Sequence, residues 1–278
     1  MKALSERLAA PDVSPGGRPF AIGRVVLAIA RVEGRRLVRN PLFLVGIALS
    51  VAMTLMNGNE PVRGPHSFVE PVWPAGFPIG PLAVFGFLAT NLAAMRDRLN
   101  RTEEPFGSAP LSRRARTAAL LVSAAWAVAA GLLVLAPFVI AFAIADGVSH
   151  ADLVMSEEPM IVAVLAIAGV ALGRLLPTRT VAPVVAFFTL LVMGVYAHPI
   201  MPRHFLGLWV VPDSLPSVGW HILYLAGLGT CLAAVALLSE RVRRSLVEAA
   251  AGGVGAVVAG AILQLPVSCP GASPCVFR

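Results

Sequence analysis

The sequence predicts an all-α fold: a polytopic membrane helical bundle of six to seven transmembrane helices, preceded by an N-terminal interfacial helix. Of the 278 residues, 57% are hydrophobic and 13% are charged, a composition too apolar for a soluble globular domain. Apolar runs recur at lengths near the roughly 20 residues that cross a hydrocarbon core. Backbone polar groups find no water in lipid, so these runs are expected to be helices.

The amino-terminal segment, residues 1–19, predicts a flexible cytoplasmic tail. It contains Pro11, Pro15, Pro19 and the pair Gly16-Gly17 without any periodicity. It lacks the apolar stretch and the small-residue cleavage site of a signal peptide.

Residues 20–40 predict an amphipathic helix at the inner membrane surface. Arg24, Arg31 and Arg35 recur at spacings of seven and four, which places them on one helical face. Such a helix lies in the interface with its arginines toward anionic lipid head groups. The alternatives are a soluble helix or an extension of the first span.

A transmembrane domain is predicted over residues 41–267. The last of its apolar runs is rich in glycine, which lowers its hydropathy but allows close helix packing at Gly252, Gly253, Gly255 and Gly260, so the predicted number of spans is six to seven. Pro137 is expected to kink the third span. The expected spans are 41–56, 78–95, 118–145, 160–176, 181–196, 218–238 and 246–267.

Two further features are predicted for the outer side. The apolar stretch 205–211 is too short to cross a membrane and has prolines on both sides, so Phe205, Leu208 and Trp209 are assigned to a re-entrant or interfacial segment. In the extracytoplasmic tail, residues 268–278, the spacing of Cys269 and Cys275 permits a disulfide. Cys231 lies within a span and is expected to be a small buried apolar residue.

The basic residues indicate the orientation of the chain. Of 22 Lys and Arg residues, 19 precede the first span or lie in or beside the loops that join spans two to three, four to five and six to seven; the others are Arg63, Arg203 and Arg278. The positive-inside rule therefore places the amino terminus and these loops in the cytoplasm. Lys2 is the only lysine, a bias typical of high-GC bacterial genomes, so a multi-pass protein of the bacterial inner (plasma) membrane is expected.

A polar island, residues 96–117, separates the second and third spans and is interpreted as a cytoplasmic contact loop. Thr102 is expected to cap a short helix whose first turn holds Glu103 and Glu104 near the positive end of the helix dipole. We expect its charged groups to pair with a partner protein; the alternative is a solvated cluster that only fixes topology. The predicted contact residues are Arg101, Thr102, Glu103, Glu104, Ser112, Arg113 and Arg114.

The order of these elements resembles an ABC transporter permease of the exporter class often called ABC-two. The likeness covers roughly residues 24–244: a basic interfacial helix, two spans joined by an outer loop, a loop with Arg101-Thr102-Glu103-Glu104 and Leu111-Ser112-Arg113-Arg114, then four more spans. It rests on order and topology more than on individual letters. The resemblance implies that the loop carries a coupling helix for an ATPase subunit and that 205–211 matches re-entrant outer helices. Six-span members of that family end in the cytoplasm, so an outer carboxyl terminus is a departure.

Several chemistries are not expected on this chain. A phosphate-binding P-loop needs a lysine that Lys2 cannot supply, so ATP and Mg²⁺ are expected on a partner subunit and no enzymatic activity or cofactor on this chain. No HxxxH or HExxH spacing supports a metal site, and the sorting of basic residues by membrane side argues against nucleic-acid binding. The five histidines are expected on or near outer loops. The main polar residues within spans are expected to form interhelical hydrogen bonds; they are Thr54, Thr90, Asn91, Ser123, Thr189 and Thr230.

The sequence therefore predicts the permease subunit of an ATP-driven exporter. It is expected to pair with a second permease chain, like or unlike, and with cytoplasmic ABC ATPase subunits. Few ionisable residues fall within the spans, which favours an amphipathic or apolar cargo such as a drug, antibiotic or lipid. Two alternatives remain: a membrane scaffold that transports nothing, and an ion-coupled secondary carrier.

Overall fold

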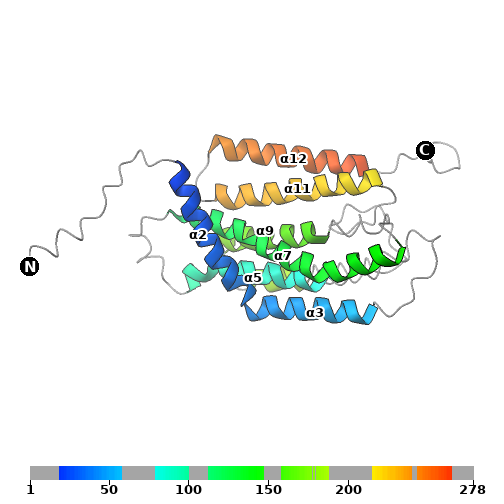
Figure 1. The fold of residues 1–278 in the computed structure, drawn as a ribbon. Coiled ribbons are helices and arrows are strands. Elements are labelled where there is room, and N and C mark those ends of the chain that lie inside the picture. The colour runs from blue at the N-terminus through cyan, green and yellow to red at the C-terminus, as the bar shows by residue number, and fades with distance from the viewer. Residues whose placement is uncertain are drawn as a thin grey trace, which may run out of the picture.

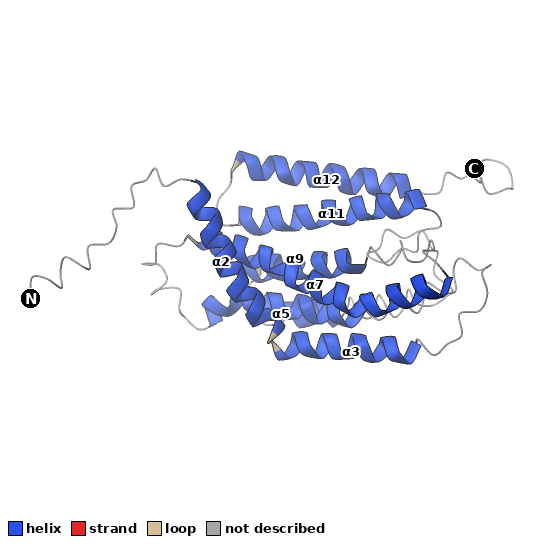
Figure 2. Ribbon diagram, in the orientation of Figure 1, coloured by secondary structure: helices blue, strands red, loops and turns tan. Residues whose placement is uncertain are grey.

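The computed structural model describes residues 19–57, 79–99, 112–146, 158–176, 178, 180–187, 215–239 and 243–264. Every regular element within these residues is a helix (Figure 2). The predicted all-α fold is therefore confirmed for this part of the chain.

The helices follow the predicted apolar runs. The fifth expected span is described only over residues 181–187, which are helical. The segment with Phe205, Leu208 and Trp209 and the tail with Cys269 and Cys275 lie outside the described residues. The helices are α2 (Pro19–Val38), α3 (Pro41–Asn57), α5 (Gly80–Leu99), α7 (Arg113–Asp146), α9 (Glu158–Leu175), α11 (Leu215–Leu238) and α12 (Arg244–Gln264).

Four helical segments are long and apolar enough to cross a membrane: Arg113–Pro137, Glu158–Leu175, Gly219–Leu238 and Arg244–Leu263. A fifth candidate is the bent pair Gly23–Val38 and Pro41–Met53. At 17 residues α3 is about 26 Å long, slightly less than the hydrocarbon core of about 30 Å. The chain is thus membrane-embedded in character, with four to five candidate spans among the described helices.

The helices form a bundle with one crossing element (Figure 1). The order of neighbours is α3, α5, α9, α11, α12, and α7 packs against α9 and α2. Helix α2 runs across one end of the bundle instead of along it (Figure 1). The largest apolar core joins residues from α3, α5, α7, α9 and α11, including the fully buried Phe43, Leu82, Val162 and Leu225.

The junction of α2 and α3 shows why the chain turns there. Asn40 caps α3: its side-chain Oδ1 accepts a hydrogen bond from the Leu42 N–H at 3.0 Å. Pro41 occupies the first helical position, where its missing N–H costs nothing. The two helices are bent by 61° at this break. The sharp turn lets α2 lie across the end of the bundle while α3 runs along it.

Close packing of α5 on α9 forms the centre of the bundle. Gly169 and Gly173 lie one helical turn apart on α9 and allow the α5 backbone to approach. The Thr90 hydroxyl donates to the Ala166 carbonyl at 2.9 Å, and the Asn91 amide donates to the Gly169 carbonyl at 3.2 Å. The expected interhelical hydrogen bonds are therefore present at Thr90 and Asn91. Ser123 and Thr230 instead bond to carbonyls of their own helices.

Helix α12 packs mainly against α11. Gly253 and Gly260 of α12 are buried against α11, while no atom comes within 4 Å of a Cβ built at Gly252 or Gly255. Close packing predicted for four glycines is thus found at Gly253 and Gly260. Cys231 is a free thiol at this contact, half-buried, with Sγ 3.6 Å from the Ala250 carbonyl.

Candidate functional site

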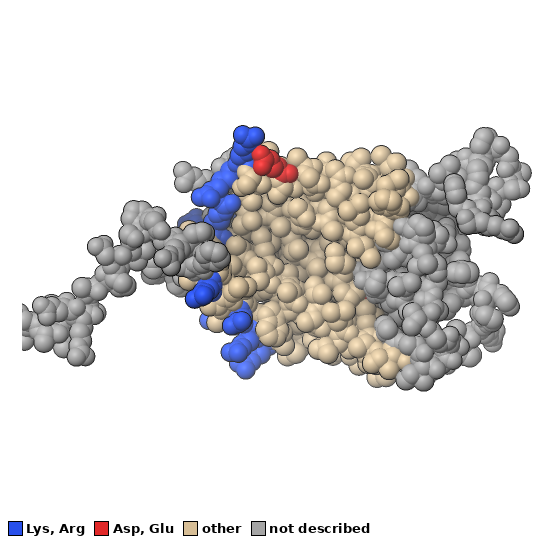
Figure 3. Space-filling model, turned by 45° about the horizontal axis from the view of Figure 1, so that its top comes forward, with Lys and Arg blue, Asp and Glu red and all other residues tan. Residues whose placement is uncertain are grey.

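The described arginines gather at one end of the bundle, where α3, α7 and α12 begin and α5, α9 and α11 end (Figure 3). We call this surface the arginine-rich end. Its members are Arg24, Arg31, Arg35, Arg36, Arg39, Arg96, Arg113, Arg114, Arg116, Arg174, Arg243 and Arg244.

Among the described residues, acidic side chains are scarce at this end. Glu33 and Glu248 are the glutamates described there, and Glu248 pairs with Arg244 within α12 at 2.8 Å. A surface with such an excess of one charge produces a positive potential that attracts acidic partners and anionic lipids. The arginine-rich end is therefore suited to docking.

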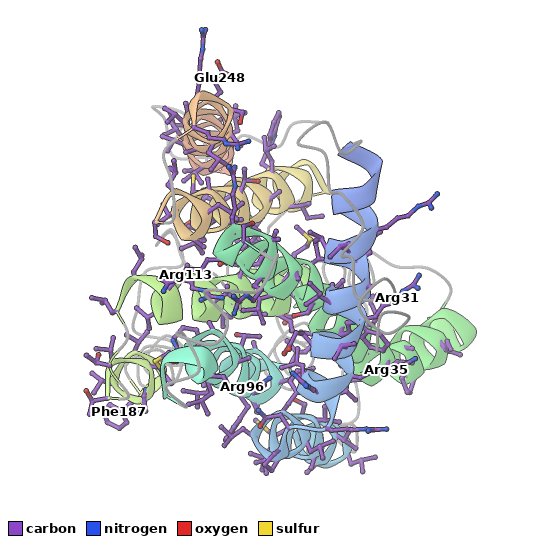
Figure 4. The ribbon with its side chains drawn as sticks, turned by 90° about the vertical axis from the view of Figure 1, so that its left-hand side faces the viewer. Arg31, Arg35, Arg96, Arg113, Phe187 and Glu248 are labelled. Atoms are coloured by element: carbon purple, nitrogen blue, oxygen red, sulfur yellow. The ribbon has the colours of Figure 1, made fainter. Side chains whose placement is uncertain are left out.

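Helix α2 has an exposed side, which carries arginines together with Val25, Leu27 and Val32, and an apolar side buried against the bundle. Arg24, Arg31 and Arg35 are exposed, whereas Ala30 and Leu37 are buried against the bundle. Figure 4 looks onto the arginine-rich end and shows Arg31 and Arg35 on the outer side of α2. This arrangement matches the two-faced helix predicted over residues 20–40.

The second half of the predicted contact set lies at the start of α7. Ser112 is the N-cap: its hydroxyl accepts a hydrogen bond from the Ala115 N–H at 3.2 Å. Arg113 is exposed and Arg114 half-buried in the first turn, and Figure 4 places Arg113 and Arg96 toward the middle of this end. Arginine so near a helix N-terminus is disfavoured by the helix dipole, which fits a role other than stabilising α7.

The first half of the set, Arg101, Thr102, Glu103 and Glu104, lies outside the described residues. The chain between the end of α5 and the start of α7 must nevertheless begin and finish at the arginine-rich end.

An ion pair that the sequence did not predict links α2 to α5. Glu33 accepts from Arg36 at 2.8 Å and from Arg96 at 3.3 Å. Arg96 is the first residue of the polar island, so the pair fastens the interfacial helix to the point where this island leaves the bundle. The sequence did not predict this pair, because Arg96 lies among residues of both charges and Glu33 is 63 residues away.

Three of the described ionisable side chains are buried in the bundle: Glu158, Arg174 and His221, at 7%, 8% and 1% exposure. Glu158 was expected before the span 160–176, in the outer loop that precedes it, but α9 begins at this residue. His221 was expected near the outer face, within the span 218–238; it lies in α11 near the end opposite the arginines, where it is buried and its ring stacks on Tyr224 with centroids 5.8 Å apart. The bundle interior is therefore less free of ionisable groups than the sequence indicated.

Glu158 and His221 lie at similar levels of neighbouring helices. A Cβ built at Gly229 of α11 contacts Val164 and Ile167 of α9, and both helices run toward the arginine-rich end. Glu158 and His221 lie a similar number of residues before this contact in their helices. At a rise of about 1.5 Å per residue, they therefore lie at the same depth, at the end opposite the arginines.

No cluster of three or more His, Cys, Asp or Glu side chains suited to a metal ion occurs in the described part of the chain. The chain matches no protein-family model, and no curated protein or solved structure shows significant similarity to it.

Proposed function

We propose that this chain is the transmembrane permease subunit of an ATP-driven ABC exporter in a bacterial plasma membrane, with its amino terminus in the cytoplasm. The observation that carries the proposal is the arginine-rich end, where α2 lies across the bundle and the polar island leaves it. Lys and Arg concentrate on the cytoplasmic side of membrane proteins. An exporter whose motor is a separate ATPase needs its docking surface on that side.

The proposed bundle crosses the membrane six to seven times. Beyond the four segments that are long and apolar enough on their own, α3, α5 and the helix that starts at residue 181 are taken as spans. The last turns of α5 carry Arg96 and Arg98, which shortens its apolar part and places its end at the interface.

In this proposal a second permease chain, like or unlike, completes the pathway. Two cytoplasmic ATPase subunits bind ATP and Mg²⁺, and their closure is transmitted through the polar island to α5 and α7. The cargo moves between the two permeases. The apolar faces of the bundle favour an amphipathic or apolar cargo such as a drug, an antibiotic or a lipid.

Reversal of two acidic charges in the polar island tests the proposal. In the double variant Glu103→Lys/Glu104→Lys, recovery of a P-loop ATPase with the chain and its transport-coupled ATP hydrolysis should fall, since like charges at a contact disfavour binding. Glu248→Lys reverses one acidic charge at an exposed position of this end and should leave both values near wild type. Unchanged recovery and hydrolysis in the double variant would refute the docking role.

A second candidate is an ion-coupled secondary carrier, favoured by the burial of Glu158 and His221 at one depth of the bundle. Buried ionisable groups of membrane helices often carry coupling ions or protons. This candidate predicts transport that collapses with the ion gradient while ATP persists, and that fails in Glu158→Gln. A scaffold subunit, by contrast, predicts neither transport nor an associated ATPase.

A further inference from the structure

We propose that α2 is a brace that sets the position of α5 relative to α7, and that Glu33 is its key positioning residue. The inference rests on the proposed function in one respect: it assigns to the brace the task of holding the polar island for its partner. The mechanical part concerns this chain alone.

The first fastening joins α2 to α7. Gly34 is buried against the indole of Trp126, and a Cβ built at Gly34 would occupy the space of the indole atoms Cδ1 and Nε1. Only glycine allows this approach, because every other residue would push α2 away from α7. The contact is therefore specific in position as well as apolar.

The second fastening joins α2 to α5 through the neighbouring residue. The Glu33 carboxylate is 16% exposed and binds Arg36 of its own helix and Arg96 of α5. The Glu33–Arg96 pair links two helices, whereas the pairs Glu33–Arg36 and Glu248–Arg244 each lie within one helix. Because Glu33 is half-buried, solvent and salt screen its interaction with the two arginines less than they screen an exposed ion pair.

The two fastenings act on the two helices that flank the polar island. The polar island begins at the end of α5 and finishes at the start of α7, while Glu33 and Gly34 are adjacent on α2. A single short stretch of α2 thus contacts both helices, α5 in its last turn at Arg96 and α7 within the helix at Trp126. Asn40 and Pro41 connect α2 to α3 without slack, so movement of α2 also reaches the bundle.

Electrostatics makes Glu33 the sensitive point of this brace. Arg36 and Arg96 lie on the same carboxylate, so its removal leaves two guanidinium groups facing each other within a surface already rich in arginine. Like charges at such a spacing repel. Loss of the carboxylate should therefore push the end of α5 away from α2, not merely release it.

Distance measurements between spin labels test the brace on the full chain in lipid nanodiscs. Leu92 of α5 and Val122 of α7 are exposed near this end and accept labels through Leu92→Cys and Val122→Cys, with Cys231, Cys269 and Cys275 changed to Ser. The otherwise wild-type chain should give one narrow distance distribution. In Glu33→Gln the distribution should widen and shift to longer distance, and Gly34→Ala should act in the same direction.

Two comparisons separate positioning from a general loss of structure. Glu248→Gln removes a carboxylate with the same 2.8 Å bond to arginine, but within a single helix, and should leave the distribution unchanged. Glu33→Gln/Arg96→Gln removes the repulsion as well as the pair, so its distribution should lie closer to wild type than that of Glu33→Gln.

A Glu33→Gln distribution equal to wild type overturns the proposal, whatever Gly34→Ala does. Failure of the wild-type chain to recover a P-loop ATPase would refute the proposed function instead, and would leave the distance result standing. The two failures are therefore distinguishable.

Discussion

Gly169→Val is expected to destabilise the chain strongly, because it disrupts the contact between α5 and α9 at the centre of the bundle. A Cβ at this position would clash with the Phe87 carbonyl oxygen and the Thr90 hydroxyl of α5. Overpacking of a tight core costs about 1–3 kcal/mol, and the upper part of that range is expected because a backbone carbonyl cannot rotate away. The Asn91 and Thr90 hydrogen bonds to α9 would be lost with the contact. Thermal unfolding of the purified chain measures the effect.

The matched control is Gly252→Val on α12, because a Cβ there meets no atom within 4 Å. This variant should unfold at or near the wild-type temperature. If Gly169→Val unfolds at the same temperature as Gly252→Val, α5 and α9 do not approach as closely as described.

Gly253→Val is expected to detach α12 from α11. A Cβ at Gly253 would lie 2.7 Å from Cys231 Sγ and 2.9 Å from the Gly227 carbonyl oxygen. The branched side chain should separate the two helices locally and uncover the Cys231 thiol, which now packs against α12. With Cys269 and Cys275 changed to Ser, the rate of Cys231 modification by N-ethylmaleimide should rise severalfold relative to the same chain with Gly253 intact.

The neighbouring residue again supplies the control, since Gly252 is exposed and a Cβ there meets no atom within 4 Å. Gly252→Val should leave the modification rate of Cys231 unchanged. Equal rates in the two variants would mean that Gly253 does not hold the helices together.

The helices themselves could be predicted because backbone polar groups in lipid must form hydrogen bonds within their own segment. Long apolar runs such as the one ending at Leu238 give the helix directly, and arginines, prolines and glycines mark the ends. Pro137, expected to kink the third span, lies inside α7, which continues to Asp146. The boundary at Glu158 was misplaced because an acidic residue at a helix start resembles a loop residue by composition.

Packing between helices was less accessible to sequence reasoning. The spacing of Gly169 and Gly173 indicates close helix contact, but close packing was predicted only for the glycines of the last span. Which of Gly252 and Gly253 faces α11 depends on the rotation of α12, which its composition does not fix. Helix α12 is apolar on all sides, so no face stands out.

The basic character of the candidate site could be predicted, whereas its internal contacts could not. Topology requires that arginines of alternate loops meet at one end, as Arg31, Arg96 and Arg113 do. The pairing of Glu33 with Arg96 depends on the angle at which α2 crosses the bundle, and that angle is set by the break at Asn40. The remaining predicted contacts, Arg101 to Glu104, lie outside the described residues.

The orientation of the arginine-rich end in the membrane tests the account most directly. Single cysteines are placed by Arg113→Cys at this end and by Gly219→Cys at the start of α11, where a Cβ meets no neighbour, in a chain with its native cysteines changed to Ser. A membrane-impermeant maleimide should modify position 113 in inside-out vesicles and not in intact cells, with the reverse at position 219. Modification of position 113 from outside intact cells would contradict the account, because no cytoplasmic ATPase could then reach the arginine-rich end.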